Sequence, residues 1–182
     1  MLQLDYQLIV DDHVEYQLYL ASISERIQKK RLRNRIIVSI VYLILAVTLF
    51  LVASYMTGVL FLIIAVLWYV FYPMRDRKRY RKHYEAFFRE DASNGKSSTI
   101  HAELTTSSIH LEEENSESTI KTTAIQFIDE IGLYYFIRFA KNKAIILPKS
   151  QIHHKAAFKN WVDMVTEQHN IERNTDLNWT WK

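Results

Sequence analysis

The sequence predicts an α+β membrane protein: a two-helix transmembrane hairpin joined to a small antiparallel β domain that ends in a helix. Two observations predict this fold class. Residues 36–73, assigned to the hairpin, contain no Asp, Glu, Lys, Arg or His, although 24% of the chain is charged. Beyond residue 97, apolar residues follow the alternation of short strands. A chain of 182 residues has room for one small domain beside such a membrane segment.

The first segment, residues 1–35, is predicted to hold a strand and then a helix beside the membrane. Apolar and polar residues alternate over 2–8, and we expect this strand to add an edge to the sheet formed later in the chain. Asp11 and Asp12 with Glu15 predict a helix start. Neither Pro nor Gly follows before the uncharged segment, so this helix is expected to continue into the first span.

The uncharged segment is too long for one crossing. As a single helix, residues 36–72 would extend roughly 55 Å, whereas a bilayer core of about 30 Å needs about 20 residues. The polar cluster at 54–58 lies near the middle, and Gly58 has the backbone freedom that a tight turn needs. We therefore predict two antiparallel membrane helices at 36–53 and 59–72.

Basic residues flank the hairpin on both sides, and its turn has none. Because Lys and Arg beside a span are retained in the cytoplasm, we expect two spans with both termini cytoplasmic. The flanks act first as a topology signal. The alternative is a specific site for anionic headgroups of the lipid bilayer at the cytoplasmic face, at about 1 kcal/mol per residue. The flanking residues are Arg26, Lys29, Lys30, Arg31, Arg33, Arg35, Arg75, Arg77, Lys78, Arg79, Arg81 and Lys82.

A second helix beside the membrane is predicted at 74–90, directly after Pro73, because aromatic residues recur there with helical spacing. The helices on either side of the spans either continue the hairpin into the cytoplasm as a stalk or lie in the headgroup plane. A polar linker at 91–98 then separates the membrane part from the β domain.

Residues 97–168 are predicted to form an antiparallel meander closed by a helix at 153–168, with the N-terminal strand as a seventh strand. The helix carries an apolar stripe that includes Phe158 and Trp161. The last segment, 169–182, is expected to be a tail. Its two Trp residues either dock on the domain, touch the membrane interface, bind a partner or belong to a disordered end. The predicted strands are 99–104, 107–113, 117–121, 125–130, 133–139 and 143–147.

Before the last predicted helix the chain has the motif Ile146, Leu147, Pro148 and Lys149. This motif, a hydrophobic-Pro-Lys strand end, and the order of the predicted elements resemble the YcxB-like family of bacterial membrane proteins. The resemblance implies a bacterial inner membrane location and a C-terminal β-roll of the pleckstrin-homology (PH-like) type, capped by the last helix. It implies no activity, because the family has none established.

No motif for catalysis, for a cofactor or for a metal stands out. The chain has three Gly and no Cys, which excludes glycine-rich phosphate loops and thiol chemistry. The adjacent His153 and His154 are poorly placed to share a metal. No aromatic-basic motif of a nucleic-acid reader accompanies the basic flanks. We therefore assign no catalytic, cofactor or metal residue, and we expect neither an enzyme nor a nucleic-acid partner.

These observations predict a membrane-anchored cytoplasmic binding or sensing module without enzymatic activity. Its protein partner is unknown, and a homo-oligomer is left open. The alternative is a subunit of a membrane transport or channel assembly in which the hairpin is the working part. The lack of charge within the spans counts against an ion path built by this chain alone.

Overall fold

The computed structural model describes residues 2–92, 98–113, 116–139 and 143–181. The protein is α+β, with two long apolar helices and mainly antiparallel sheets, as the sequence predicts. It divides into two compact units, which are described separately. The domain unit contains residues 1–16 and 87–180, and the hairpin unit contains residues 17–86 and 181–182.

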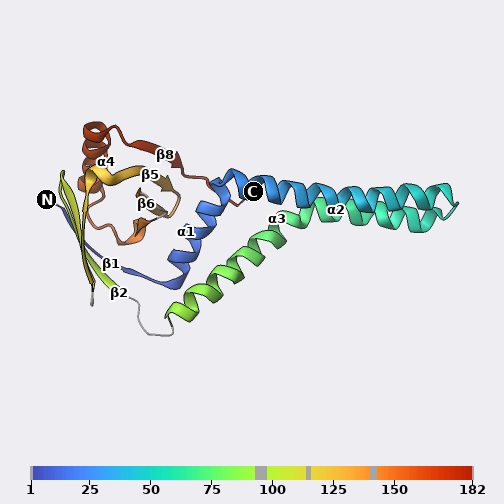
Figure 1. Ribbon diagram of the computed structural model, residues 1–182, viewed down its shortest axis with the longest axis horizontal. Helices are drawn as coiled ribbons and strands as arrows, with labels where there is room; N and C mark the ends of the chain where they lie inside the picture. Colours follow the sequence, from blue (N-terminus) through green and yellow to red (C-terminus); the bar gives the residue numbers. More distant parts are fainter. Residues whose placement is uncertain (1, 93–97, 114–115, 140–142, 182) are drawn as a thin grey trace. The chain divides into compact units, whose positions relative to one another are not determined.

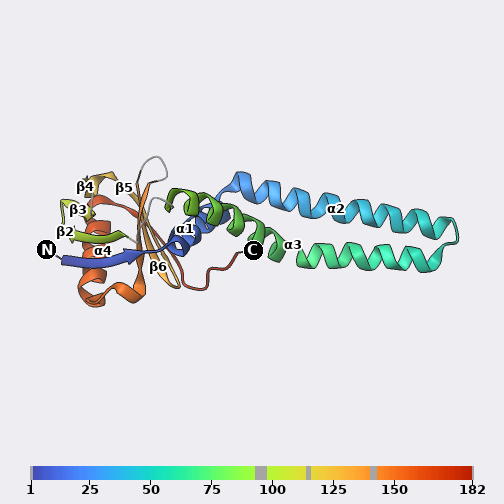
Figure 2. The ribbon, with the colours of Figure 1, turned by 90° about the horizontal axis from the view of Figure 1, so that it is seen from below.

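The hairpin unit is built on two long helices. Helix α2 covers Glu25–Leu51 and helix α3 covers Tyr55–Ala92, and both are long and apolar enough to cross a membrane. Figures 1 and 2 both show α2 running antiparallel beside the first part of α3. The predicted second span and the predicted helix at 74–90 are one continuous helix through Pro73. Of the predicted linker at 91–98, residues 93–97 lie outside the described part.

The turn between the two helices comes earlier than predicted. Ala53 takes a left-handed conformation with φ of 58°, and the Gly58 N–H donates to the Ser54 carbonyl at 3.0 Å, within the first turn of α3. The prediction that Gly58 forms the turn is therefore wrong. A Cβ at Gly58 would lie 3.1 Å from the ring of Phe50. Glycine is suited to this position because the two helices approach closely there.

The N-terminal helix also differs from its prediction. Helix α1 covers Val10–Ile23 and ends at Ser24, whose ψ of 112° is extended, so it does not continue into α2. Its start is fixed by Asp12, which accepts a hydrogen bond from the Ile9 N–H at 2.8 Å. The helix therefore begins before the predicted cap at Asp11–Asp12 with Glu15, and the Asp12 carboxylate instead reaches back to the residue before the helix, as in a capping box.

The domain unit contains two four-stranded sheets, where the sequence predicted one sheet of seven strands. The first sheet has the order β1-β2-β3-β4 and is antiparallel throughout. Strand β1 lies at its edge, as expected, with Leu4 opposite Ala102. The chain turns from the first sheet to the second at the short helix η1, Thr122–Ala124. The strands of the first sheet are β1 Leu2–Leu8, β2 Ser98–Leu104, β3 Ser108–Glu113 and β4 Ser116–Lys121.

The second sheet has the order β7-β6-β5-β8 and contains a strand that the sequence did not predict. Strand β8 lies in the expected tail and runs parallel to β5, with Phe127 opposite Glu172. The sequence predicted a tail here and no strand. Its sequence, Glu-Arg-Asn-Thr-Asp, has no apolar residue to signal a strand. The strands are β5 Ile125–Ile131, β6 Tyr134–Phe139, β7 Ala144–Pro148 and β8 Glu172–Asp176.

Helix α4, Lys155–His169, lies at one end of the space between the two sheets (Figure 1). It buries Phe158 and Trp161, as predicted. The Trp161 indole donates a hydrogen bond to the Thr105 carbonyl, between β2 and β3, at 2.7 Å. The ring of Phe158 packs 4.9 Å from that of Tyr135 on β6. The helix thus contacts both sheets and closes the core at this end.

Candidate functional site

The apolar side chains of α2 and α3 are exposed along the length of the hairpin. In the most apolar segment of α2 only 6% of the residues are buried, and in that of α3 only 11%. Ile44 is 59% exposed and Val66 is 55% exposed. A core helix of a water-soluble protein would bury such residues. This surface is suited to the hydrocarbon of a bilayer.

A buried ion pair joins α2 and α3 at the end of the hairpin opposite the turn. The Arg31 Nε donates to Asp76 Oδ2 at 2.6 Å, and their side chains are only 9% and 1% exposed. Arg79 Nη2 donates to the other oxygen, Asp76 Oδ1, at 3.0 Å. One carboxylate therefore holds two arginines, one from each helix. Buried charges are tolerated only when they are paired in this way.

Trp181, near the end of the sequence, completes this site within the hairpin unit. Its ring lies under the Arg31 guanidinium, 3.9 Å away, and packs 5.3 Å from the ring of Tyr80. Trp181 is 8% exposed. The sequence left this residue either docked or disordered, and the structure places it over the ion pair. We call Arg31, Asp76, Arg79, Tyr80 and Trp181 the hairpin-base cluster.

Arg35 donates a hydrogen bond to a carbonyl of α3 that Pro73 cannot serve. Pro73 has no N–H, so it cannot donate to the carbonyl four residues earlier, that of Tyr69. The Arg35 Nε donates to this carbonyl at 2.8 Å, and its guanidinium lies 3.8 Å from the Tyr69 ring. The Arg75 guanidinium lies 4.9 Å from the Trp68 ring. Arginines and aromatic rings thus gather at the non-turn end, the composition typical of a membrane interface.

The other predicted flanking residues lie along α2 and α3. Arg81 pairs with Glu85 on its own helix at 2.8 Å and is half-buried. The exposed Lys29 pairs with Glu25 at 3.1 Å. The remaining residues lie exposed on α2 and α3, and these are Arg26, Lys30, Arg33, Arg77, Lys78 and Lys82.

Asp76 is the functional residue that sequence reasoning missed. It is the one acid between Arg75 and Lys82 in an otherwise basic and aromatic stretch. A hairpin that pairs residue 36 with residue 72 places residue 76 opposite residue 32, one position from Arg31. The isolated acid and this register together contained the signal for an interhelical ion pair.

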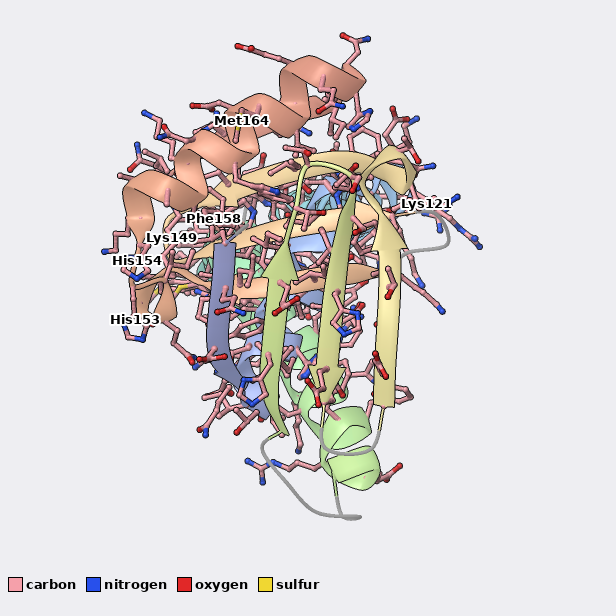
Figure 3. All side chains as sticks on the ribbon, turned by 90° about the vertical axis from the view of Figure 1, so that its left-hand side faces the viewer. Lys121, Lys149, His153, His154, Phe158 and Met164 are labelled. Carbon is pink, nitrogen blue, oxygen red and sulfur yellow. The ribbon has the colours of Figure 1, made fainter. Side chains whose placement is uncertain are left out.

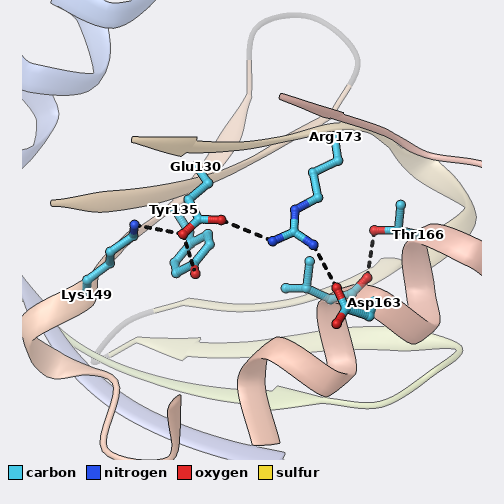
Figure 4. A network of polar contacts seen from close by, with 7 residues as sticks. Glu130, Tyr135, Lys149, Asp163, Thr166 and Arg173 are labelled. Carbon is cyan, nitrogen blue, oxygen red and sulfur yellow. Dashed lines mark hydrogen bonds and ion pairs between the residues drawn. The ribbon is translucent and has the colours of Figure 1, made fainter. Parts of the chain in front are cut away.

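In the domain unit, Lys149 of the family-like motif belongs to a network of ion pairs (Figure 4). Glu130 on β5 accepts hydrogen bonds from Lys149 at 2.9 Å, from the Tyr135 hydroxyl at 2.8 Å and from Arg173 at 3.1 Å. Arg173 also donates to Asp163 on α4 at 2.7 Å. The network therefore ties β5, β6, β8, α4 and the end of β7 together.

The apolar part of the motif lies in the core. Ile146, Leu147 and Pro148 belong to β7 and are buried, with Pro148 opposite Tyr134 at the end of the strand. Lys149 follows at once, in the short helix η3, Lys149–Gln151. The motif thus ends a buried strand and directs a cation to Glu130.

The Glu130 network predicts a pH dependence. Burial alone would raise the pKa of Glu130, but hydrogen bonds from Lys149, Tyr135 and Arg173 outweigh it and hold the pKa below its ordinary value of 4.5. A lowered folded-state pKa adds stability above the unfolded-state pKa, and this stability is lost as the pH falls through the folded-state value. Glu130→Gln is expected to lower the Tm at pH 7, with a deficit that shrinks below about pH 4.5.

Thermal unfolding of the full chain in detergent, followed from pH 7 to pH 3, checks this expectation. Glu172→Gln is the matched control, because Glu172 is an exposed acid on the neighbouring strand β8. It should leave the pH profile unchanged. A Glu130→Gln deficit that stays constant down to pH 3 would show that the carboxylate contributes no linked protonation.

The exposed face of the first sheet carries acids and histidines in a shallow hollow, but they form no metal centre. Asp5 pairs with His101 at 2.6 Å, and His110 pairs with Glu117 at 3.2 Å. In the part of the chain that the structure describes, no group of three His, Asp or Glu side chains could hold a metal ion. His153 and His154 lie just before α4, near its first turn (Figure 3).

Comparisons with protein-family models, with curated proteins and with solved structures gave no match to this chain.

Proposed function

We propose that the chain is a membrane-anchored binding or sensing module without enzymatic activity, held by a two-span hairpin in a bacterial inner membrane with both termini and the β domain in the cytoplasm. In this proposal the basic flanks meet anionic headgroups at the cytoplasmic face. The β domain is a PH-like roll that contacts a protein partner. The resemblance to YcxB-like membrane proteins is part of the proposal and supports its architecture.

The observation that carries the proposal is the contrast between the two ends of the hairpin. The apolar surface of the helices ends on one side at the hairpin-base cluster and at the pairs Arg35–Tyr69 and Arg75–Trp68. On the other side, the turn exposes Tyr55 and Met56 and carries no basic residue. Basic residues at one end of the hairpin favour a cytoplasmic location for that end.

A binding role for the domain is supported by where its charges lie. The buried acids of the described domain unit are engaged in structural contacts: Asp12 accepts hydrogen bonds from the Tyr134 hydroxyl and the Ile9 N–H, and Asp129 pairs with Arg138 and Asn174. The half-buried Glu130 is engaged in its network. The exposed sheet face and the outer face of α4 remain for contact with a partner. Met164 on α4, for example, is 50% exposed (Figure 3).

Photo-crosslinking in cells separates this function from the transport alternative. A photoreactive residue is placed at Met164 or Lys159 on α4 and, separately, at Ile44 or Val66 on the hairpin. The proposal predicts protein adducts from exposed positions of the domain and lipid adducts alone from the hairpin. If Ile44 and Val66 instead crosslink to a different protein, and the domain positions give no protein adduct, the result would support a subunit of a transport or channel assembly.

A further inference from the structure

Strand β4 is an edge strand with one unpartnered side. Its pairing with β3 runs from Ser108 opposite Lys121 to Glu113 opposite Ser116. No strand of the described chain pairs with its other side, where the first sheet ends. Residues 116–119 are exposed on both faces of the strand. Figure 3 shows Lys121 at the end of β4, on the outermost strand of this sheet.

Strand β4 lacks several of the usual protections of a sheet edge. Edges are commonly blunted by charged side chains, by proline, by a bulge or by a charge that points inward, and of these β4 has only the outward charges of Glu117 and Lys121. The sequence Ser-Glu-Ser-Thr-Ile-Lys has no proline, and its register with β3 is unbroken. Ile120, opposite the buried Ile109, marks the inward face, so Glu117 and Lys121 point outward.

We propose that β4 pairs with β4 of a second copy of this chain, in antiparallel orientation about a two-fold axis at Thr119. This register places Glu117 of each copy opposite Lys121 of the other. Thr119 then lies opposite itself, and Ser118 lies opposite Ile120. Opposite charges facing each other across strands stabilise pairing, and like charges oppose it.

The register follows from the residues of the strand. Side chains directly opposite in an antiparallel pair point to the same face, so the two-fold axis must pass through a residue. An axis at Glu117 sets that acid against itself. Axes at Ser118 or Ile120 place Thr119 opposite one of the charged residues. An axis at Thr119 places Glu117 of each copy opposite Lys121 of the other. The two first sheets then form one continuous sheet of eight strands.

The pairing is expected to be weak in dilute solution. A single strand pair buries far less than the roughly 1,200–2,000 Å² of a standard stable interface. Confinement of two copies to one membrane would raise their effective concentration. The pairing itself uses only residues of the domain unit, so it can occur even if the hairpin has another role.

The absence of native cysteine allows a direct test with the full chain in phosphatidylcholine vesicles. Opposite residues in an antiparallel pair have Cα atoms about 4.5–5.5 Å apart, within disulfide reach. Thr119→Cys should form a disulfide dimer on mild oxidation. Ser118→Cys and Ile120→Cys should cross-link when mixed, more than either does alone. Ser107→Cys, exposed in the loop before β3, controls for random collision.

Charge reversal in the Thr119→Cys background tests the register. Glu117→Lys or Lys121→Glu alone makes both symmetric pairs repulsive and should lower the dimer fraction roughly tenfold. The double variant Glu117→Lys with Lys121→Glu should restore it. The proposal is overturned if Thr119→Cys cross-links no faster than Ser107→Cys, or if the double variant fails to recover what the single variants lose. All three substitutions lie on exposed side chains, so the fold should persist.

Discussion

Asp76→Asn is expected to destabilise the hairpin by about 3–5 kcal/mol, because it leaves the buried Arg31 without its counter-ion. Asparagine has nearly the shape of aspartate, so the loss reports charge and hydrogen bonding more than packing. Arg31 cannot reach solvent to compensate, since its side chain is only 9% exposed. Thermal unfolding of the full chain in detergent micelles, followed by tryptophan fluorescence, measures the change. Trp181, stacked on Arg31, places a reporter at the site.

Two further variants separate this effect from a general loss of charge. Glu85→Gln breaks the ion pair with Arg81, whose partners are 29% and 36% exposed, and should cost less than about 1 kcal/mol. The double variant Arg31→Leu with Asp76→Leu removes both buried charges and should cost less than Asp76→Asn alone. If Asp76→Asn and Glu85→Gln lower the free energy of unfolding equally, the buried Arg31–Asp76 pair contributes no more to stability than the more exposed Arg81–Glu85 pair.

The hairpin was predictable because its signal is compositional. A run of residues without charge, too long for one span and basic at both ends, allows few arrangements. The detail of its turn was not predictable from glycine alone. Ala53 takes the left-handed position, whereas Gly58 serves a close contact with Phe50. Local freedom and tight packing both favour glycine, and only the structure shows which applies at Gly58.

The strands with apolar alternation were predicted within about two residues, and β8 was missed. Strand β8 is held by polar side chains: Arg173 reaches Glu130 and Asp163, and Asn174 reaches Asp129. Glu130 and Asp129 lie more than forty positions earlier, in β5, and Asp163 lies on α4, so no local pattern within β8 reveals these partners. The division into two sheets was missed for a related reason, because the corner at Thr122 depends on contacts distant in sequence.

The hairpin-base cluster illustrates the same limit for the candidate site. Counting basic residues identified Arg31 and Arg79 as members of two flanks with one shared role. The structure gives Arg31 a distinct role, because it alone among the flanking cations is buried in the described part of the chain. Its partners are an acid on the other helix and the last tryptophan of the chain. The sequence contains all of these residues, but it does not show that they contact one another.

The central claim, a two-span hairpin with its turn outside and its domain inside the cell, is tested most directly by cysteine labelling in intact cells. The turn is marked by Met56→Cys, at a side chain that is 89% exposed, and the domain by Asn160→Cys on the exposed face of α4. Cells expressing either variant of the otherwise cysteine-free chain are treated with a membrane-impermeant thiol reagent, before and after lysis.

We expect Met56→Cys to react in intact cells and Asn160→Cys to react only after lysis. Labelling of Asn160→Cys in intact cells would contradict this expectation and would place the β domain outside the cytoplasm. If neither position reacts until lysis, the hairpin does not cross the membrane.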